Sequence, residues 1–190
     1  MPGILLLVVL VAVALWVVGA YNSLISLKNQ VVNAWKQIDV QLKRRHDLIP
    51  NLVNTVKGAM DFERTTLEAV ISARNKAVSA QGVGATAKAE GELTQALGRL
   101  FALSENYPEL KSSSNVLQLQ EELTSTENKI GFSRQLYNDV ATQYNTRQMQ
   151  FPTNLVSGLA KAAPAELWEI QDAGERAVPT VDLSLNQPPA

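Results

Sequence analysis

The sequence contains no cysteine and a single histidine, His46. Without cysteine the chain can form no disulfide, and it has no thiolate to act as a metal ligand or a nucleophile. One histidine also leaves carboxylates almost alone to hold a zinc or di-iron centre, and such centres generally use imidazole or thiolate ligands. The sequence therefore predicts no metal site, no cofactor and no cysteine-based catalysis.

An excess of positive charge is also missing, because the formal net charge is −1. Nucleic-acid binders usually carry a strong basic excess that neutralises phosphates. No glycine-rich phosphate loop or serine nucleophile elbow occurs. Glu63 and Glu68 are five residues apart, which puts them on different faces of a helix and makes an acid–base pair unfavourable. We therefore expect no enzyme activity, no small-molecule substrate and no nucleic-acid partner.

A long apolar run occupies the N-terminus instead. No charged residue lies between Ile4 and Tyr21, and Leu, Val, Ile and Ala dominate. At about 1.5 Å of rise per residue, a helix of this length crosses most of a hydrocarbon core about 30 Å thick. Trp16 and Tyr21 lie toward the end of the run, where amphipathic rings favour the membrane interface. Residues 1–21 are therefore predicted to be a transmembrane anchor.

A cleaved signal peptide is the alternative interpretation, since Val18-Gly19-Ala20 offers the small residues of a cleavage site. However, no Lys or Arg precedes the run, which is also longer than a usual signal-peptide core. We therefore expect a retained anchor that crosses the membrane once. Lys28 and Lys36 follow the span, and positive charge favours the cytoplasmic side. The N-terminus is thus expected outside and the C-terminal domain in the cytoplasm.

Helical periodicity continues through most of the remaining chain. After the anchor, apolar residues recur in steps of three or four, which places them on one helix face. These residues are Leu24, Leu27, Val31, Ala34, Ile38 and Leu42. No helix breaker separates them from the apolar run, so we expect one continuous helix. Asp47 and Pro50 have the pattern of an N-cap and a first turn, and they predict the start of a second helix.

The second helix is predicted to bury seven apolar side chains and to end near Gly82. Those side chains are Leu52, Val53, Val56, Met60, Leu67, Val70 and Ile71. A third helix is expected over about Thr86–Asn106, stopped or bent by Pro108. A fourth begins near Asn115, which has capping-box spacing to Gln118.

The fourth helix has the clearest pattern, because apolar and aromatic residues recur every seven positions. They are Val116, Leu123, Ile130, Tyr137, Tyr144 and Phe151, with Leu119, Thr126, Ser133 and Val140 at the complementary position. Such a heptad repeat is typical of knobs-into-holes packing. Its polar residues, including Asn138 and Asn145, are expected to fix helix register through buried hydrogen bonds. Pro152 ends the helix, and short helices are expected over 153–162 and 165–176.

Helices with one apolar stripe are unstable alone in water, and long helices joined by short loops pack antiparallel. The predicted fold is therefore all-α: an N-terminal transmembrane helix continues into an elongated antiparallel helical bundle with long helices. The bundle is expected over residues 22–163, and a short helix and an extended tail over 164–190.

Charged residues concentrate at the predicted junction of the first two helices. One hypothesis is that Lys43, Arg44, Arg45 and Asp47 bind a partner. The alternative is a solvated turn with ion pairs inside the bundle, because exposed charges usually contribute little. Anionic lipid is a poor fit, since along a straight helix these residues lie ~33 Å beyond Tyr21 at about 1.5 Å per residue, several Debye lengths from the membrane. His46 is expected to be exposed beside the loop.

Several stretches resemble the LemA family of bacterial membrane proteins. The most specific is IDVQLKRRHDLIPNLV at 38–53; YNSL at 21–24, ENYP at 105–108, TEN at 126–128 and the Tyr-Asn pairs at 137 and 144 add to it. The resemblance implies a helical domain anchored in the bacterial inner membrane, with its N-terminus outside and the domain in the cytoplasm. The family has no agreed biochemical activity. Some relatives are connected with membrane-stress proteases or internal membrane organelles, which favours scaffolding.

We therefore expect a membrane-anchored, non-enzymatic scaffold or adaptor. It would self-associate as a homo-oligomer or bind other membrane proteins. The alternative is a lipid-binding module that shapes membranes. A hydrolase or metalloenzyme is a third hypothesis, which the single histidine and the absence of cysteine disfavour.

Overall fold

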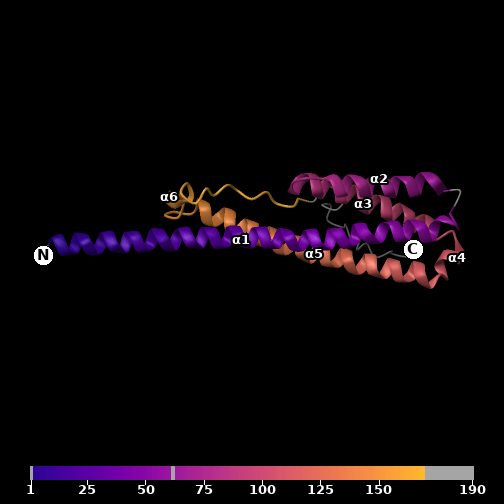
Figure 1. Ribbon diagram of the computed structural model, residues 1–190, viewed down its shortest axis with the longest axis horizontal. Helices are drawn as coiled ribbons and strands as arrows, with labels where there is room; N and C mark the ends of the chain where they lie inside the picture. Colours follow the sequence, from indigo (N-terminus) through magenta and orange to yellow (C-terminus); the bar gives the residue numbers. More distant parts are fainter. Residues whose placement is uncertain (1, 61–62, 170–190) are drawn as a thin grey trace, which may run out of the picture.

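The computed structural model describes residues 2–60 and 63–169, and over these ranges the protein is all-α and elongated (Figure 1). Two long helices run antiparallel, and a hairpin of two shorter helices packs beside them at the end far from the N-terminus. The helices are α1 (Pro2–Lys57), α2 (Arg64–Ser79), α3 (Val83–Ser104), α4 (Pro108–Lys111), α5 (Ser114–Met149) and α6 (Asn154–Ser157). No strand occurs within the described ranges, so the predicted fold class is confirmed.

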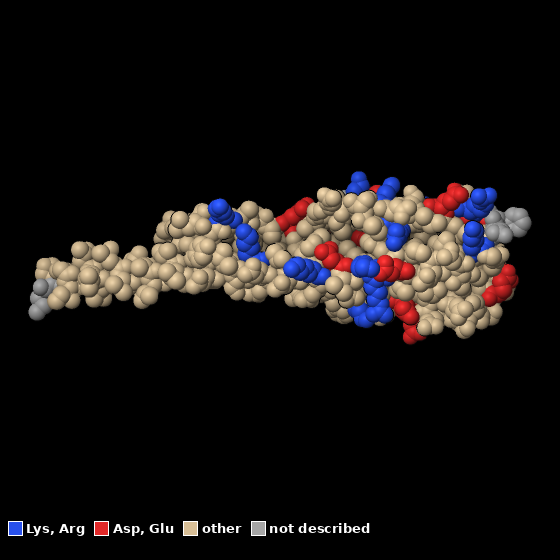
Figure 2. All heavy atoms as spheres, in the orientation of Figure 1, with Lys and Arg blue, Asp and Glu red and all other residues tan. Residues whose placement is uncertain are grey.

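The first part of α1 projects from the bundle without protein neighbours. The large apolar side chains between Ile4 and Trp16 are exposed around the helix, and Ala20 is the first buried residue. Figure 2 shows no charged side chain on this narrow end of the molecule. Within the described ranges, α1 is the one helix long and apolar enough to cross a membrane. The apolar run and the first bundle helix are one 56-residue helix, as predicted.

The predicted helix start at Asp47 and Pro50 is wrong, because α1 continues through both residues to Lys57. Pro50 has no N–H to donate to the carbonyl oxygen of His46, its partner four residues earlier. The neighbouring helix supplies another donor, since Arg74 Nε on α2 donates to that carbonyl oxygen at 3.3 Å. The freed acceptor is satisfied, and the helix can accommodate the proline without ending.

The chain reverses direction only after Lys57, in a turn that buries Met60. The side chains predicted for a second helix are therefore divided among the end of α1, this turn and α2. All are buried except Ile71, which is 43% exposed on α2, contrary to the prediction. The third helix is confirmed as α3, and it packs against α2 as an antiparallel hairpin.

The heptad positions of α5 form its buried face. Val116, Leu123, Ile130, Tyr137 and Tyr144 are all buried. The complementary position drifts, because an α-helix has 3.6 rather than 3.5 residues per turn: Ala141 and Gln148 are buried instead of Val140 and Arg147. Phe151 is 80% exposed, since α5 ends at Met149. The predicted capping box is also wrong, because the N-cap is Ser113 and makes no side-chain cap bond.

Two apolar clusters lie along the bundle. The larger joins the end of α1 to α2, α3, α4 and the start of α5. The smaller lies nearer the apolar end of α1, where α1 packs on α5 around Ile38, Ile130 and Tyr137. The α2–α3 hairpin does not extend over all of this part. The segment 162–169 returns along the bundle instead and adds Trp168 to the smaller cluster.

Side-chain amides of α5 hold this returning segment in an extended conformation. Asn138 accepts from the backbone N–H of Trp168 and donates to its carbonyl oxygen, both at 2.9 Å. Asn145 makes the same pair of bonds to Ala165, at 2.7 and 2.8 Å. The short helix predicted from residue 165 is therefore wrong over 165–169, and its remainder lies outside the described residues. The two asparagines satisfy an extended backbone rather than set the register between helices.

Two buried tyrosines of α5 differ in whether their hydroxyl has a partner. The Tyr137 hydroxyl donates to the Glu166 carbonyl oxygen at 2.6 Å, whereas that of Tyr144 has no partner among the described residues. Burial raises the pKa of both groups, so both remain neutral phenols at pH 7. Tyr137→Phe should lower stability by about 1 kcal/mol, while Tyr144→Phe should be neutral or stabilising by a similar amount. Denaturant unfolding of the two variants in detergent checks this, and equal losses would contradict it.

Candidate functional site

The four predicted partner-binding residues lie within α1, in its part that belongs to the bundle, and not in a loop. Successive residues of a helix point about 100° apart, so the structure separates them. Lys43 and Asp47 are exposed and paired at 2.6 Å, and this hydrogen bond holds the pKa of Asp47 below its usual value. Arg44 is exposed, 3.8 Å from Glu122 of α5. Arg45 points inward, and its side chain is 4% exposed.

Arg45 is the centre of a polar group, the Arg45 cluster, in which Arg45, His46 and Glu90 are buried and Thr94 and Glu127 lie at the exposed edge. Arg45 Nη1 lies 3.0 Å from Glu90 Oε2 and 3.1 Å from Glu127 Oε2, and Nη2 donates to Thr94 Oγ1 at 2.8 Å. His46 Nε2 lies 2.6 Å from Glu90 Oε1. The expectation of an exposed His46 is wrong, because α1 does not end there and its side chain faces α3.

The Arg45 cluster connects three helices at one height of the bundle. Arg45 and His46 come from α1, Glu90 from α3 and Glu127 from α5. A buried charge is strongly unfavourable without partners, so the cluster disfavours any sliding of these helices that would separate the charges. Arg45 is therefore placed to fix the register of the bundle and is not available to an external partner.

Glu90 and Thr94 were not singled out from the sequence, although a signal for Glu90 was present. Glu90 precedes Leu93 by three residues and Leu97 by seven, which is the spacing of one helix face. Arg45 likewise lies between Leu42 and Ile49 in steps of three and four. An arginine and a glutamate that each fall within an apolar stripe indicate a buried pair.

Proton-transfer chemistry at the Arg45 cluster is disfavoured because a substrate has no open path to the His46–Glu90 pair, which is buried among the described residues. A carboxylate beside an imidazole can move a proton only if a substrate reaches it. A hollow of about 250 Å³ lies beside the cluster, but neither His46 nor Glu90 lines it. Its walls are Arg45, Thr94, Leu97, Gly98, Phe101, Leu123, Thr124, Glu127 and Asn128. A molecule in this hollow would meet an apolar wall and Glu127 rather than the His46–Glu90 pair.

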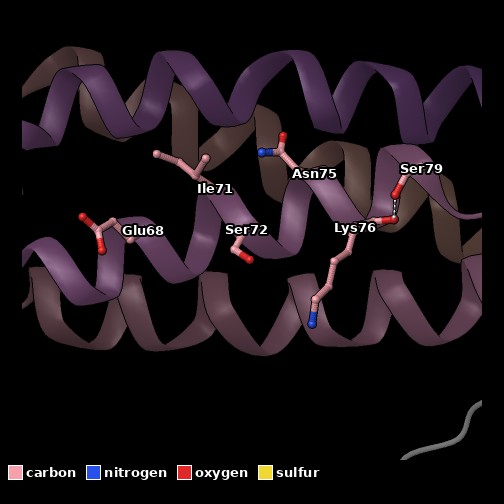
Figure 3. A pocket seen from close by; sticks show the side chains of 6 residues that line it. All are labelled: Glu68, Ile71, Ser72, Asn75, Lys76 and Ser79. Carbon is pink, nitrogen blue, oxygen red and sulfur yellow. Dashed lines mark hydrogen bonds between the residues drawn. The ribbon is translucent and has the colours of Figure 1, made fainter.

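A second hollow of about 470 Å³ follows the exposed side of α2 (Figure 3). Its six side chains all come from this one helix, and Ser79 is hydrogen-bonded to the backbone carbonyl of Lys76. Lys76 is further paired with Glu92 at 3.1 Å. Binding sites usually gather polar groups from several elements onto one point, and this surface does not. Nor does any group of three or more potential metal ligands occur among the described residues.

One helix that is long and apolar enough to cross a membrane continues without a break into an antiparallel bundle. The protein therefore belongs to the class of all-helical domains joined directly to an apolar N-terminal helix. The comparisons give the family: the LemA family model matches residues 34–183, and the chain belongs to the LemA family. It is 31% identical over 142 residues to Protein LemA of Metamycoplasma hominis, covering 74% of this chain and 64% of that protein. It is also 24% identical over 189 residues to Magnetosome proteins MamQ 1 and MamQ 2 of Paramagnetospirillum magneticum, covering 86% of this chain and 70% of theirs.

Proposed function

We propose that the protein is a non-enzymatic scaffold anchored in the bacterial inner membrane. The bundles of neighbouring copies would associate side by side at the membrane surface. The observation that carries this proposal is the unbroken α1, which is both the apolar span and a full-length helix of the bundle. A flexible linker would let the domain tumble, whereas one continuous helix holds the bundle at a fixed height along its own axis above the membrane. The relatives named as magnetosome proteins are consistent with a role at a membrane surface.

Charge distribution supports a cytoplasmic bundle. From residue 1 to 38 and from 140 to 165 the chain has no Asp or Glu, and its charged residues there are Lys28, Lys36, Arg147 and Lys161. Both stretches lie at the end of the bundle nearest the apolar span, because α1 and α5 are antiparallel. Basic residues flanking a span favour the cytoplasmic side. We propose that the N-terminus is outside.

The outward face of α1 has charged side chains of both signs around an apolar one, since Asp39 and Asp47 are also exposed on it. Lys36, Val40 and Arg44 follow at intervals of four residues and therefore share one face, and Lys43 lies beside them. Val40 is 64% exposed. The ion pairs of Lys43 and Arg44 are also exposed, so they contribute little to stability. Both side chains can therefore exchange these partners for others.

The outward face of α5 likewise has exposed apolar side chains among charged ones of both signs, because Lys129 precedes Phe132 by three residues. Phe132, Leu136 and Asp139 follow at intervals of four and three residues, so they share one face. Phe132 is 74% exposed and Leu136 43%. Glu121 lies on the same face about three turns earlier. Phe132 and Leu136 give α5 an apolar surface that can cover Val40, and the exposed Glu121, Lys129 and Asp139 can pair with charges of opposite sign around Val40.

The two faces lie at the same height above the membrane. The Arg45–Glu127 pair shows that these two residues lie at the same height on the antiparallel helices α1 and α5. Val40 precedes Arg45 by five residues and Phe132 follows Glu127 by five residues, so both lie the same distance closer to the span. A second copy anchored in the same membrane stands parallel to the first. The α1 face of one copy can therefore meet the α5 face of the next, with Val40 against Phe132 and Lys36 near Asp139. We propose this second copy as the partner of Lys43 and Arg44.

Cross-linking in membranes tests this contact, because the chain has no native cysteine. Val40→Cys and Phe132→Cys chains carrying different tags are co-expressed and treated with a short bis-maleimide. We expect a cross-linked pair containing both tags. Val78→Cys paired with Val40→Cys is the matched control, since Val78 is 52% exposed but lies on α2. Cross-linking no stronger than this control would refute side-by-side association through these faces.

A further inference from the structure

The end of the bundle nearest the span has a cluster of exposed apolar side chains that the scaffold contact does not use. Met149, Phe151, Leu155 and Leu159 are between 68% and 80% exposed. Phe151, Leu155 and Leu159 are spaced by four residues through the short helix α6 and the turns around it. Single exposed apolar residues are ordinary, but a contiguous group of large ones usually marks a contact surface.

The opposite side of the same segment anchors it to the bundle. Thr153, Val156 and Ala160 are buried, and α6 packs against both α1 and α5. The segment is therefore apolar on two sides. One side is covered by the bundle, and the other, formed by Phe151, Leu155 and Leu159, has no cover among the described residues.

The height of this segment along α1 indicates what covers its exposed side. The register set by Arg45 and Glu127 places Gln148, near the end of α5, at the height of Leu24 on α1. Ala20 and Leu24 are the first buried residues of α1. They lie where the charge-free run ends, since Lys28 is the first charged residue of the chain. Figure 1 shows α6 beside this part of α1. A bilayer crossed by the preceding residues has its interface at this level.

The charges around the cluster match such a surface. Lys28, Arg147 and Lys161 are exposed near it, and the nearest acidic residues in the sequence are Asp39, Asp139 and Glu166. On the face shown in Figure 2, basic side chains without acidic ones lie where the bundle narrows to the anchor. Interfacial segments combine apolar side chains in the acyl boundary with basic ones that reach lipid phosphates.

We propose that residues 149–161 form a second membrane contact, in which Phe151, Leu155 and Leu159 insert into the interface of the bilayer that α1 crosses. This proposal rests on the membrane anchor of the proposed function, but not on self-association. The contact and the span together hold the bundle at two points. The bundle then has a fixed tilt and a fixed rotation about α1, which a single span alone does not impose.

Fluorescence quenching in liposomes tests the contact with the full-length chain. A fluorophore is attached to Leu155→Cys in vesicles that contain anionic lipid, with and without lipids carrying a nitroxide near the headgroup. We expect lipid nitroxide to cause a loss of fluorescence at Leu155, together with protection from a water-soluble quencher. The matched control is Leu117→Cys, which is also exposed on the bundle, near the end of α5 farther from the span and outside the proposed contact between copies.

The possible outcomes separate this contact from the anchor. A Leu155 label quenched only from water overturns the contact, provided that a label on Leu10→Cys in the span is quenched by lipid nitroxide. A Leu10 label open to water would show instead that the anchor itself is not in the bilayer. A Leu155 label shielded from both quenchers also overturns the proposal, in favour of a protein covering the cluster.

Discussion

Replacing Arg45 with alanine is expected to destabilise the bundle by about 3–5 kcal/mol, the range for breaking a buried ion pair from one side. The substitution leaves the Glu90 carboxylate, 5% exposed, without the guanidinium 3.0 Å away. It also removes the donor to Thr94 and the bridge to Glu127. His46 remains as a partner for Glu90, but it contacts the other carboxylate oxygen and cannot connect α5.

The neighbouring Arg44 is the matched control, because it has the same side chain one residue earlier. Its side chain is half exposed, and its guanidinium lies 3.8 Å from the Glu122 carboxylate. Arg44→Ala should therefore change stability by only ~0–1 kcal/mol. Tryptophan fluorescence can follow unfolding in detergent, since Trp35 and Trp168 pack together with 5.9 Å between ring centroids. Equal losses for the two variants would mean that the Arg45 cluster does not stabilise the bundle.

The same two variants separate structural from partner-binding roles within the charged segment. If Arg44 faces a neighbouring copy, Arg44→Ala should weaken the cross-link between Val40→Cys and Phe132→Cys while leaving the melting transition almost unchanged. Arg45→Ala should lower the melting transition first. The two variants are expected to differ because the helix directs Arg45 inward and Lys43, Arg44 and Asp47 outward.

Most of the helical architecture follows from apolar periodicity. The main error in the predicted helix boundaries, a helix start at Asp47 and Pro50, involves a contact with a residue distant in the sequence. Asp47 and Pro50 have the local chemistry of a helix start, and nothing nearby in the sequence argues against it. In the folded protein Arg74, on another helix, donates to the His46 carbonyl that Pro50 leaves free, so the lost helix hydrogen bond is replaced. The replacement donor thus comes from a residue 28 positions away in the chain. Periodicity describes which face a helix buries, but it does not reveal such a donor.

The returning segment 162–169 shows the same limit. The alanines, glutamates, Leu167 and Trp168 of this stretch allow a short helix, and the sequence alone does not show that Asn138 and Asn145 will bind backbone groups there. Asparagine in a long helix is compatible with a helix–helix hydrogen bond or with solvent. The structure assigns both residues to an extended chain, which could be inferred only after α5 and the segment had been placed together.

The buried face of α5 is the part of the fold that the sequence defines most directly, and Ile130 lies at its centre. Ile130 is 1% exposed, in the smaller apolar cluster with Ile38 of α1 and Ala87 of α3. Ile130→Asp removes the apolar side chain and introduces a carboxylate without a partner. The first effect alone is worth about 2–5 kcal/mol for a large aliphatic residue, and burial of the charge adds to it. We therefore expect a loss of about 4 kcal/mol or more.

Gln135→Asp is the control for helix propensity and charge, because Gln135 is exposed on the same helix. It introduces the same carboxylate, which water solvates, and should change stability by less than about 0.5 kcal/mol. Denaturant unfolding of the full-length variants in detergent compares the two. A small loss at Ile130 would show that α1 and α5 separate easily in this region. The register that places Val40 and Phe132 at the same height would then no longer hold, and the proposed contact between copies would fail with it.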